Sequence, residues 1–378
     1  MSNWGWSGGV GIVFGVVSFG LSFFLIVAVQ YRRFGRFTGL RLLGAGAVSI
    51  YLTTLVAYTL LPLPTSRERV CAPTLQLVPF QFVSDIVTDT AGDGLLAILT
   101  SQAMLQVVFN VLLFVPLGVI VRGFFSRGLG TSVLVGLVAS VLIEATQYTG
   151  IWGLYACPYR VADIDDVLTN TLGAVIGALL GPVVLGWMPG QRALAATRAT
   201  PRPVTIRRRW LGMAIDLVLF GALGSALTIP YVLIWIATTG AAPDAPDPAR
   251  TALGTLVPAL VVFVIPALRG TGASLGQSAV WLAPRWRAHP TLGRRIARAL
   301  TVGGAYGVLL FVSDLTLLLS GTAAFLAHLL LVADFVAVPF TPGAAGLSGI
   351  LTGATMRDQR EPVTGPADPG NSPSHRRE

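Results

Sequence analysis

Charge is scarce in this 378-residue sequence. Asp, Glu, Lys and Arg together make up 11% of it, and hydrophobic residues make up 53%. A soluble domain carries about 25% charged residues, so this composition excludes an ordinary soluble globular protein and indicates a membrane protein. Lysine is absent altogether, so the net charge of +9 comes from arginine alone. A nucleic-acid-binding protein needs a basic face with interleaved aromatics. Here the arginines lie between apolar runs, and we expect no nucleic-acid partner.

Cysteine is almost absent as well. The two cysteines, Cys71 and Cys157, both fall in loops that we expect on the outer side of the membrane. An oxidising exterior permits a disulfide there, and closing a loop of this length would stabilise the fold by roughly 4 kcal/mol in the entropic model. The alternative is two unrelated free thiols.

Long apolar runs fill most of the chain. A helix of about 20 apolar residues spans a bilayer, and nine such runs occur: Val10–Gln30, Leu42–Leu61, Met104–Val121, Thr131–Thr149, Val167–Met188, Trp210–Ile236, Ala252–Leu268, Ala299–Leu318 and Thr322–Phe340. One helix over 299–340 would be about 63 Å long, twice the thickness of a bilayer. We therefore expect a tight hairpin at Ser320-Gly321-Thr322. The sequence predicts an all-α, polytopic membrane bundle.

The arginines indicate the orientation of the bundle. With the N-terminus outside, all but Arg67, Arg69, Arg160 and Arg250 of the 26 arginines fall on the cytoplasmic side, as the positive-inside rule requires. The C-terminus is then cytoplasmic. Because no basic residue precedes the first apolar run, we expect an uncleaved anchor and not a signal peptide. The predicted location is a plasma membrane, crossed several times, with the lipid bilayer as a partner.

The hydropathy pattern divides the chain into two membrane modules. Residues 1–188 form a module of five helices, 189–209 an Arg- and Pro-bearing cytoplasmic linker, and 210–356 a module of four helices. Residues 357–378 are rich in Pro, Gly, Asp and Arg, which is typical of a disordered tail. No internal repeat relates the two modules, which disfavours an inverted-repeat transporter.

Polar residues converge at one depth in the first module. Asn110, Glu144 and Asn170 each lie about 7–9 Å inside the outer end of an apolar helix, given the helical rise. Ionisable groups are costly in hydrocarbon, so such a layer requires a structural or functional reason. The candidate ligand-binding residues are Asn110, Glu144, Gln147, Arg160, Asp163, Asp166 and Asn170.

The order of these residues resembles the VanZ-like family. Its pattern of Pro-Phe, Asn-Phe-Pro-Gly, Glu-x-x-Gln and Arg-Asp-Asp-Asn-Gly is matched, over roughly residues 40–187, by Pro79 and Phe80; Asn110, Phe114, Pro116 and Gly118; Glu144 and Gln147; and Arg160, Asp163, Asp166, Asn170 and Gly173. The resemblance implies a bacterial membrane protein associated with low-level resistance to glycopeptides, teicoplanin more than vancomycin.

Three interpretations of this layer remain open. The groups could form a hydrogen-bond network that only joins the helices, or a site for a glycopeptide, a cell-wall lipid precursor or a phospholipid headgroup. A third is metal-assisted chemistry on a lipid phosphate, with Glu144 and Asp166 as oxygen ligands; the metal is not specified by the sequence. No Ser, His or Cys in the layer has a base at suitable spacing, which disfavours a nucleophilic hydrolase. We expect no organic cofactor and favour a non-enzymatic role.

The second module carries its own charged residues. Arg209 and Asp216 lie on one helical face, and Ser274-Leu275-Gly276 follows in the basic loop. Over roughly 205–356 these residues resemble the RDD family, although Gln277 replaces its usual basic residue and Ser348-Gly349 its closing His-Asp pair. Asp216 and Asp334 lie at similar depth and are expected to face each other or nearby arginines, as an ion or proton relay of a transporter or as a charge-paired helix lock. The all-arginine, Ala/Gly/Pro-rich composition hints at an actinobacterial source.

Overall fold

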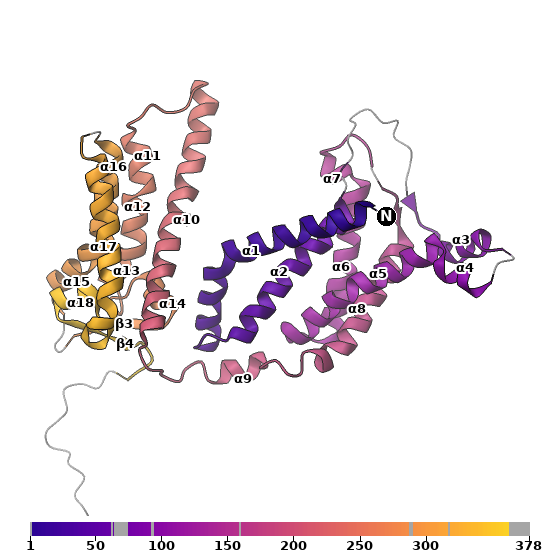
Figure 1. Cartoon of the computed structure of the whole chain (residues 1–378), viewed down its shortest axis with the longest axis horizontal. Coiled ribbons are helices and arrows are strands. Elements are labelled where there is room, and N and C mark those ends of the chain that lie inside the picture. Colours follow the sequence, from indigo (N-terminus) through magenta and orange to yellow (C-terminus); the bar gives the residue numbers. More distant parts are fainter. Residues whose placement is uncertain are drawn as a thin grey trace, which may run out of the picture. The chain divides into compact units, whose positions relative to one another are not determined.

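The computed structural model describes residues 2–61, 63, 75–91, 94–158, 160–286, 290–316 and 318–362. Within these residues nine helices are long and apolar enough to cross a membrane, as predicted (Figure 1). The protein is therefore an all-α polytopic membrane protein in its fold class. The orientation of its termini stays a prediction. The chain folds as two compact units: residues 1–26 with 38–195, and residues 27–37 with 196–378. The second division falls inside the predicted linker.

The first unit consists mainly of helices. Its elements are α1 (Ser2–Phe34, whose last turns belong to the second unit), α2 (Gly39–Leu60), β1 (Leu75–Gln76), α3 (Gln81–Asp89), α4 (Leu95–Thr100), α5 (Gln102–Val119), the π-helical η1 (Ile120–Phe124), α6 (Leu129–Tyr148), α7 (Gly150–Gly153), β2 (Ala162–Asp163), α8 (Ile164–Val184) and α9 (Gln191–Ala196). Strands β1 and β2 form a short parallel pair, with Leu75 opposite Ala162.

Small residues hold α5 and α8 together (Figure 1). A Cβ atom on Gly177 would lie 1.9 Å from the Val115 carbonyl oxygen, and one on Gly173 would lie 2.2 Å from that of Val111. Any larger side chain would force the helices apart. The glycines of α8 therefore permit the close approach that brings the polar residues of α5 and α8 into contact.

The second unit contains α10 (Ile206–Thr239), α11 (Pro248–Gly254), α12 (Leu256–Ala259), η2 (Leu260–Val264), α13 (Ile265–Leu268), α14 (Leu275–Ala279), β3 (Leu282–Trp286), α15 (Leu292–Ala299), η3 (Leu300–Gly304), α16 (Ala305–Leu315), α17 (Ser320–Phe340), the 3₁₀ turn η4 (Pro342–Ala344), α18 (Gly346–Thr352) and β4 (Ala354–Asp358). Helices α16 and α17 pack against each other (Figure 1). They form the predicted hairpin, but its turn precedes residues 320–322, because α16 ends at Leu315 and α17 already begins at Ser320.

Helix α10 and the span predicted over 252–268 differ from what hydropathy indicated. α10 is longer than the predicted run 210–236, because the Thr205 side chain accepts a hydrogen bond from Arg208 N at its start. Gly240 ends it with φ +77°, a conformation that favours glycine. The span predicted as one helix over 252–268 is built from four consecutive pieces: α11, α12, the π-helical η2 and α13.

A short antiparallel sheet closes the second unit. β4 pairs with β3 over its whole length and ends at Asp358, two residues beyond the predicted end of the membrane module. Asp358 is fully buried, and its carboxylate accepts hydrogen bonds from Arg208 Nη2 at 2.8 Å and Arg360 Nη2 at 2.6 Å. It also accepts from Arg202 N at 3.1 Å. This carboxylate therefore joins the strand to the start of α10. Residues 363–378 of the predicted tail lie outside the described residues.

Trp281 attaches the end of α1 to the same region. Its indole N–H donates to Tyr31 O at 2.8 Å, and the guanidinium of Arg32 lies 4.3 Å from the ring centroid. Arg360 and Arg198 lie 5.1 and 5.4 Å from it. Stacked guanidinium groups stabilise such an aromatic ring, so residues 27–37 pack with the second unit.

We expect Asp358→Asn to destabilise the second unit by about 3–5 kcal/mol, because it leaves buried arginines unpaired. Burial raises the pKa of Asp358, but hydrogen bonds from Arg360 and Arg208 outweigh that effect and hold the pKa at about 2, below its ordinary 3.8. The stabilisation is therefore present above about pH 4 and is lost as the pH falls toward 2. The unfolding midpoints of the wild type and of Asp358→Asn, measured across pH 2–7, test this prediction. The difference between the two midpoints should become smaller at low pH. A difference in unfolding midpoint that stays constant with pH would contradict the prediction. Asp244→Asn, at an exposed position, serves as the control.

Candidate functional site

The first unit brings polar side chains of α5, α6 and α8 together. Asn110 on α5 donates from Nδ2 to Asp166 Oδ1 on α8 at 2.7 Å, and Gln106 Nε2 donates to the same oxygen at 3.3 Å. The glycine contacts described above position these two helices. The structure therefore brings Asn110 and Asp166, two of the predicted site residues, into direct contact.

Glu144 on α6 faces the start of α8. Its Oε2 accepts a hydrogen bond from Asp163 N at 3.0 Å, and its side chain is 8% exposed. The charges of Asp166, Asp163 and Arg160 all act on this carboxylate, so the four groups lie near one another. Asp163 lies outside the spanning helix, and its burial raises the pKa of its carboxyl group above the ordinary value of 3.8. This end of the unit concentrates negative charge.

Gln147 and Arg160 both bind the end of α2. Gln147 Nε2 donates to Thr59 O at 2.7 Å, and Arg160 Nη2 donates to Leu61 O at 2.8 Å. The last carbonyl groups of a helix lack intrahelical partners, and basic side chains commonly satisfy them. These two residues therefore position α2 beside the carboxylates.

Asn170 lies one turn deeper on α8 and contacts a residue that sequence reasoning missed. Its Nδ2 donates to Ser140 Oγ on α6 at 2.9 Å, whereas its Oδ1 is buried without a hydrogen-bond partner. The predicted residues thus form three adjacent groups: Asn110 with Asp166, Glu144 with Asp163, and Gln147 with Arg160. Asn170 forms a separate contact with Ser140.

Asp165 was not among the predicted site residues, yet it makes hydrogen bonds at this end of the unit. Its Oδ1 accepts from Phe80 N at 2.6 Å and its Oδ2 from Phe82 N at 3.0 Å, at the start of α3. Phe80 has a left-handed φ of +63°. A carboxylate at a helix N-terminus satisfies unpaired N–H groups and interacts favourably with the helix dipole. The only signal in the sequence was its place beside Asp166.

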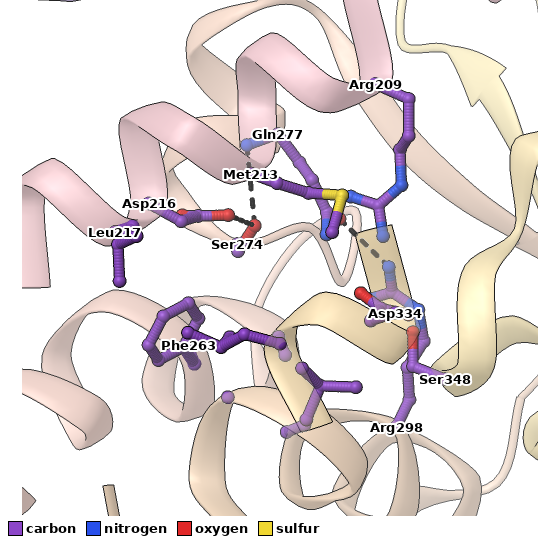
Figure 2. A pocket seen from close by; sticks show the side chains of 15 residues that line it. Arg209, Met213, Asp216, Leu217, Phe263, Ser274, Gln277, Arg298, Asp334 and Ser348 are labelled. Atoms are coloured by element: carbon purple, nitrogen blue, oxygen red, sulfur yellow. Dashed lines mark hydrogen bonds between the residues drawn. The ribbon is translucent and has the colours of Figure 1, made fainter. Parts of the chain in front are cut away.

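The second unit places its predicted cluster around a cavity of about 70 Å³. Arg209, Asp216 and Asp334 all line it, together with Arg298 and Ser348 (Figure 2). The acids were expected to face each other or nearby arginines. Both acids line this cavity together with Arg209 and Arg298, and among the described residues their hydrogen bonds go to short helices. Asp216 accepts from Gly276 N and Ser274 Oγ, each at 2.6 Å, and Asp334 accepts from Leu347 N at 2.7 Å.

Cys71 lies outside the described residues, so its disulfide with Cys157 stays a prediction. Among the residues that the structure describes, no group of three or more His, Cys, Asp or Glu is placed to hold a metal ion.

The fold and the polar layer define a multi-pass membrane protein. Residues 48–185, within the first unit, match the family model VanZ/LLP1. This part of the chain is VanZ-like, as the motifs predicted, and the match does not extend to the rest of the chain. No curated protein matches the chain, and no solved structure does. The likeness of the second unit to the RDD family stays a prediction.

The role of Asp165 can be tested by Asp165→Asn, in which one carboxylate oxygen becomes an N–H donor facing a backbone N–H. We expect a loss of about 1–3 kcal/mol of stability, the cost of an unpaired buried polar group. Amide exchange at Phe80 and Phe82 should accelerate, as measured by hydrogen–deuterium exchange in lipid nanodiscs. Asp89→Asn, at an exposed position of α3, is the matched control. Equal exchange in both variants would mean that Asp165 does not hold this helix.

Proposed function

We propose that the VanZ-like unit protects the cell envelope, contributing to resistance to teicoplanin-type glycopeptides through a polar site on the outer side of the membrane. The ligand is a glycopeptide, a cell-wall lipid precursor or a phospholipid headgroup. Each of them carries polar or charged groups that a polar site at the membrane surface can bind. The residues that we assign to the site are Asn110, Glu144, Gln147, Arg160, Asp163, Asp166 and Asn170.

The observation that supports this proposal is the gathering of three carboxylates and one arginine at one end of the unit. Among the described residues, the hydrogen bonds to Glu144 use Oε2 and those to Asp166 use Oδ1. One oxygen of each carboxylate is thus left for a ligand. A network that only joined helices would be served by amides, which avoid the cost of ionised groups in hydrocarbon.

The charge pattern indicates how such a ligand is held. Carboxylates attract ammonium groups, which occur on lipid headgroups and on glycopeptides, whereas an arginine recognises phosphate or carboxylate. Glu144 and Asp166 supply the first kind of contact and Arg160 the second. A zwitterionic headgroup or a glycopeptide presents both kinds of charge.

Susceptibility to teicoplanin and vancomycin in a sensitive Gram-positive host tests the proposal. We expect the wild type to raise tolerance to teicoplanin more than to vancomycin. Glu144→Gln and Asp166→Asn should abolish the rise, because each removes one negative charge with little change of shape.

The control for that experiment is Asp89→Asn, which removes a negative charge from an exposed position of the same unit. All variants are compared at equal membrane abundance. No rise with the wild type would argue against glycopeptide protection, and a rise that survives Glu144→Gln and Asp166→Asn would place the function outside the polar layer.

A second candidate function is transport, with Asp216 and Asp334 coupling ion or proton movement. It is favoured by the cavity that both acids line inside the second unit. In proteoliposomes with an imposed pH gradient, we expect Asp216→Asn to abolish coupled flux and Asp314→Asn, at an exposed acid of α16, to leave it unchanged. Absence of any gradient-driven flux in the wild type would exclude this candidate for the ions tested.

A further inference from the structure

The cavity of the second unit is large enough for a small molecule or ion. Its volume is about 70 Å³, and one water needs about 10–15 Å³ of such space, so it has room for several waters or one small solute. Helices α10, α15 and α17 contribute charged side chains, and Figure 2 shows Arg209, Arg298 and Asp334 directed into the same space.

Arg209 is a buried cation with unmade hydrogen bonds. Its side chain is 2% exposed, and its Nε and Nη1 are buried without a hydrogen-bond partner. Leaving buried polar or charged groups unpaired costs several kcal/mol. Arg298 lines the same cavity and also has an unpartnered buried Nε, although its other nitrogens donate to Gly272 O and Gln277 Oε1, each at 2.9 Å. The two guanidinium groups lie near enough to repel one another.

The two acids do not neutralise Arg209 by direct contact. Both oxygens of Asp216 accept hydrogen bonds from the segment at Ser274 and Gly276. Asp334 Oδ1 accepts from Leu347 N. Among the described residues, the ion pairs within 4.0 Å that the structure shows are those of Asp358 with Arg208 and Arg360, and none joins Arg209 to either acid.

We propose that this cavity binds a small oxyanion, a carboxylate or inorganic phosphate, held by the guanidinium groups of Arg209 and Arg298. A planar guanidinium presents several N–H donors in a fixed geometry that matches the oxygens of such anions, and it is the preferred side chain for binding them. The anion would supply the missing acceptors of Arg209 and separate two like charges. Ser348, which also lines the cavity, adds a hydroxyl group.

The carboxylates set the expected selectivity of the site. Asp216 and Asp334 contribute negative charge to the lining, so a large or highly charged anion is disfavoured. The backbone N–H groups that they bind reduce that charge without removing it. A small anion of low charge therefore fits the cavity best. This inference rests on the second unit alone and is independent of the function proposed for the first.

The test is a titration of the purified full-length protein in lipid nanodiscs with acetate and, separately, with inorganic phosphate. Binding is followed by calorimetry and by the unfolding temperature, which rises when a ligand binds the folded state. We expect saturable binding of at least one of the two anions. Saturation by acetate alone identifies a carboxylate ligand, and saturation by phosphate alone identifies a phosphate ligand.

Substitutions locate the bound anion. Arg209→Lys keeps the positive charge but loses the planar set of donors, and we expect it to weaken binding at least tenfold. Arg294→Lys, at an exposed position of α15, should leave binding unchanged. Asp334→Asn removes negative charge from the lining and should tighten binding.

Two results would overturn the proposal. One is the absence of saturation by either anion in the wild type, which would mean that water alone fills the cavity. The other is equal affinity in the wild type and in both Arg209→Lys and Arg298→Lys, which would place binding on the arginine-rich surface. If Arg209→Lys does not fold, as judged by size-exclusion chromatography, Arg298→Lys and the wild-type titration decide the outcome.

Discussion

Much of this structure depends on one interaction, a buried carboxylate that binds backbone N–H groups at the start of a short helix. Asp165 on α8 binds the start of α3, Asp216 on α10 binds α14, and Asp334 on α17 binds α18. In each case a long membrane helix supplies the acid, and a short helix supplies N–H groups that would otherwise lack partners. The arrangement satisfies both the buried charge and the helix end, and it fixes segments too short to fold alone.

Glycines make two of these contacts possible. A Cβ atom on Gly276 would lie 2.1 Å from Gly212 O and 2.8 Å from Asp216 Cγ. One on Gly346 would lie 2.5 Å from Asp334 Oδ1, and this residue also has a φ of +68°. Any side chain at either position would displace the carboxylate from its N–H partner. The glycines at positions 276 and 346 thus serve a packing purpose.

The spans and the meeting of polar helices could be predicted from sequence, whereas the carboxylate contacts could not. Apolar length alone defines a spanning helix, and the helical rise placed Asn110, Glu144 and Asn170 at similar depth in antiparallel helices. The partners of Asp165, Asp216 and Asp334 are backbone N–H groups, which every residue except proline possesses. No residue type therefore marks them in the sequence. The pairing of β4 with β3 also relies on backbone hydrogen bonds. Composition therefore did not indicate that the folded unit extends beyond residue 356.

Two adjacent arginines of α10 are both buried but differ in their hydrogen bonds. Burial alone therefore does not explain why the guanidinium of Arg209 lacks partners. Arg208 and Arg209 are 5% and 2% exposed. Arg208 donates to Val280 O, Trp281 O and Asp358, so its guanidinium is saturated by the protein. Arg209 lines the cavity together with Asp216 and Asp334, whose carboxylates accept hydrogen bonds from backbone N–H groups. The protein saturates the guanidinium of Arg208, whereas that of Arg209 lines the cavity with unmade hydrogen bonds, which the proposed anion would complete.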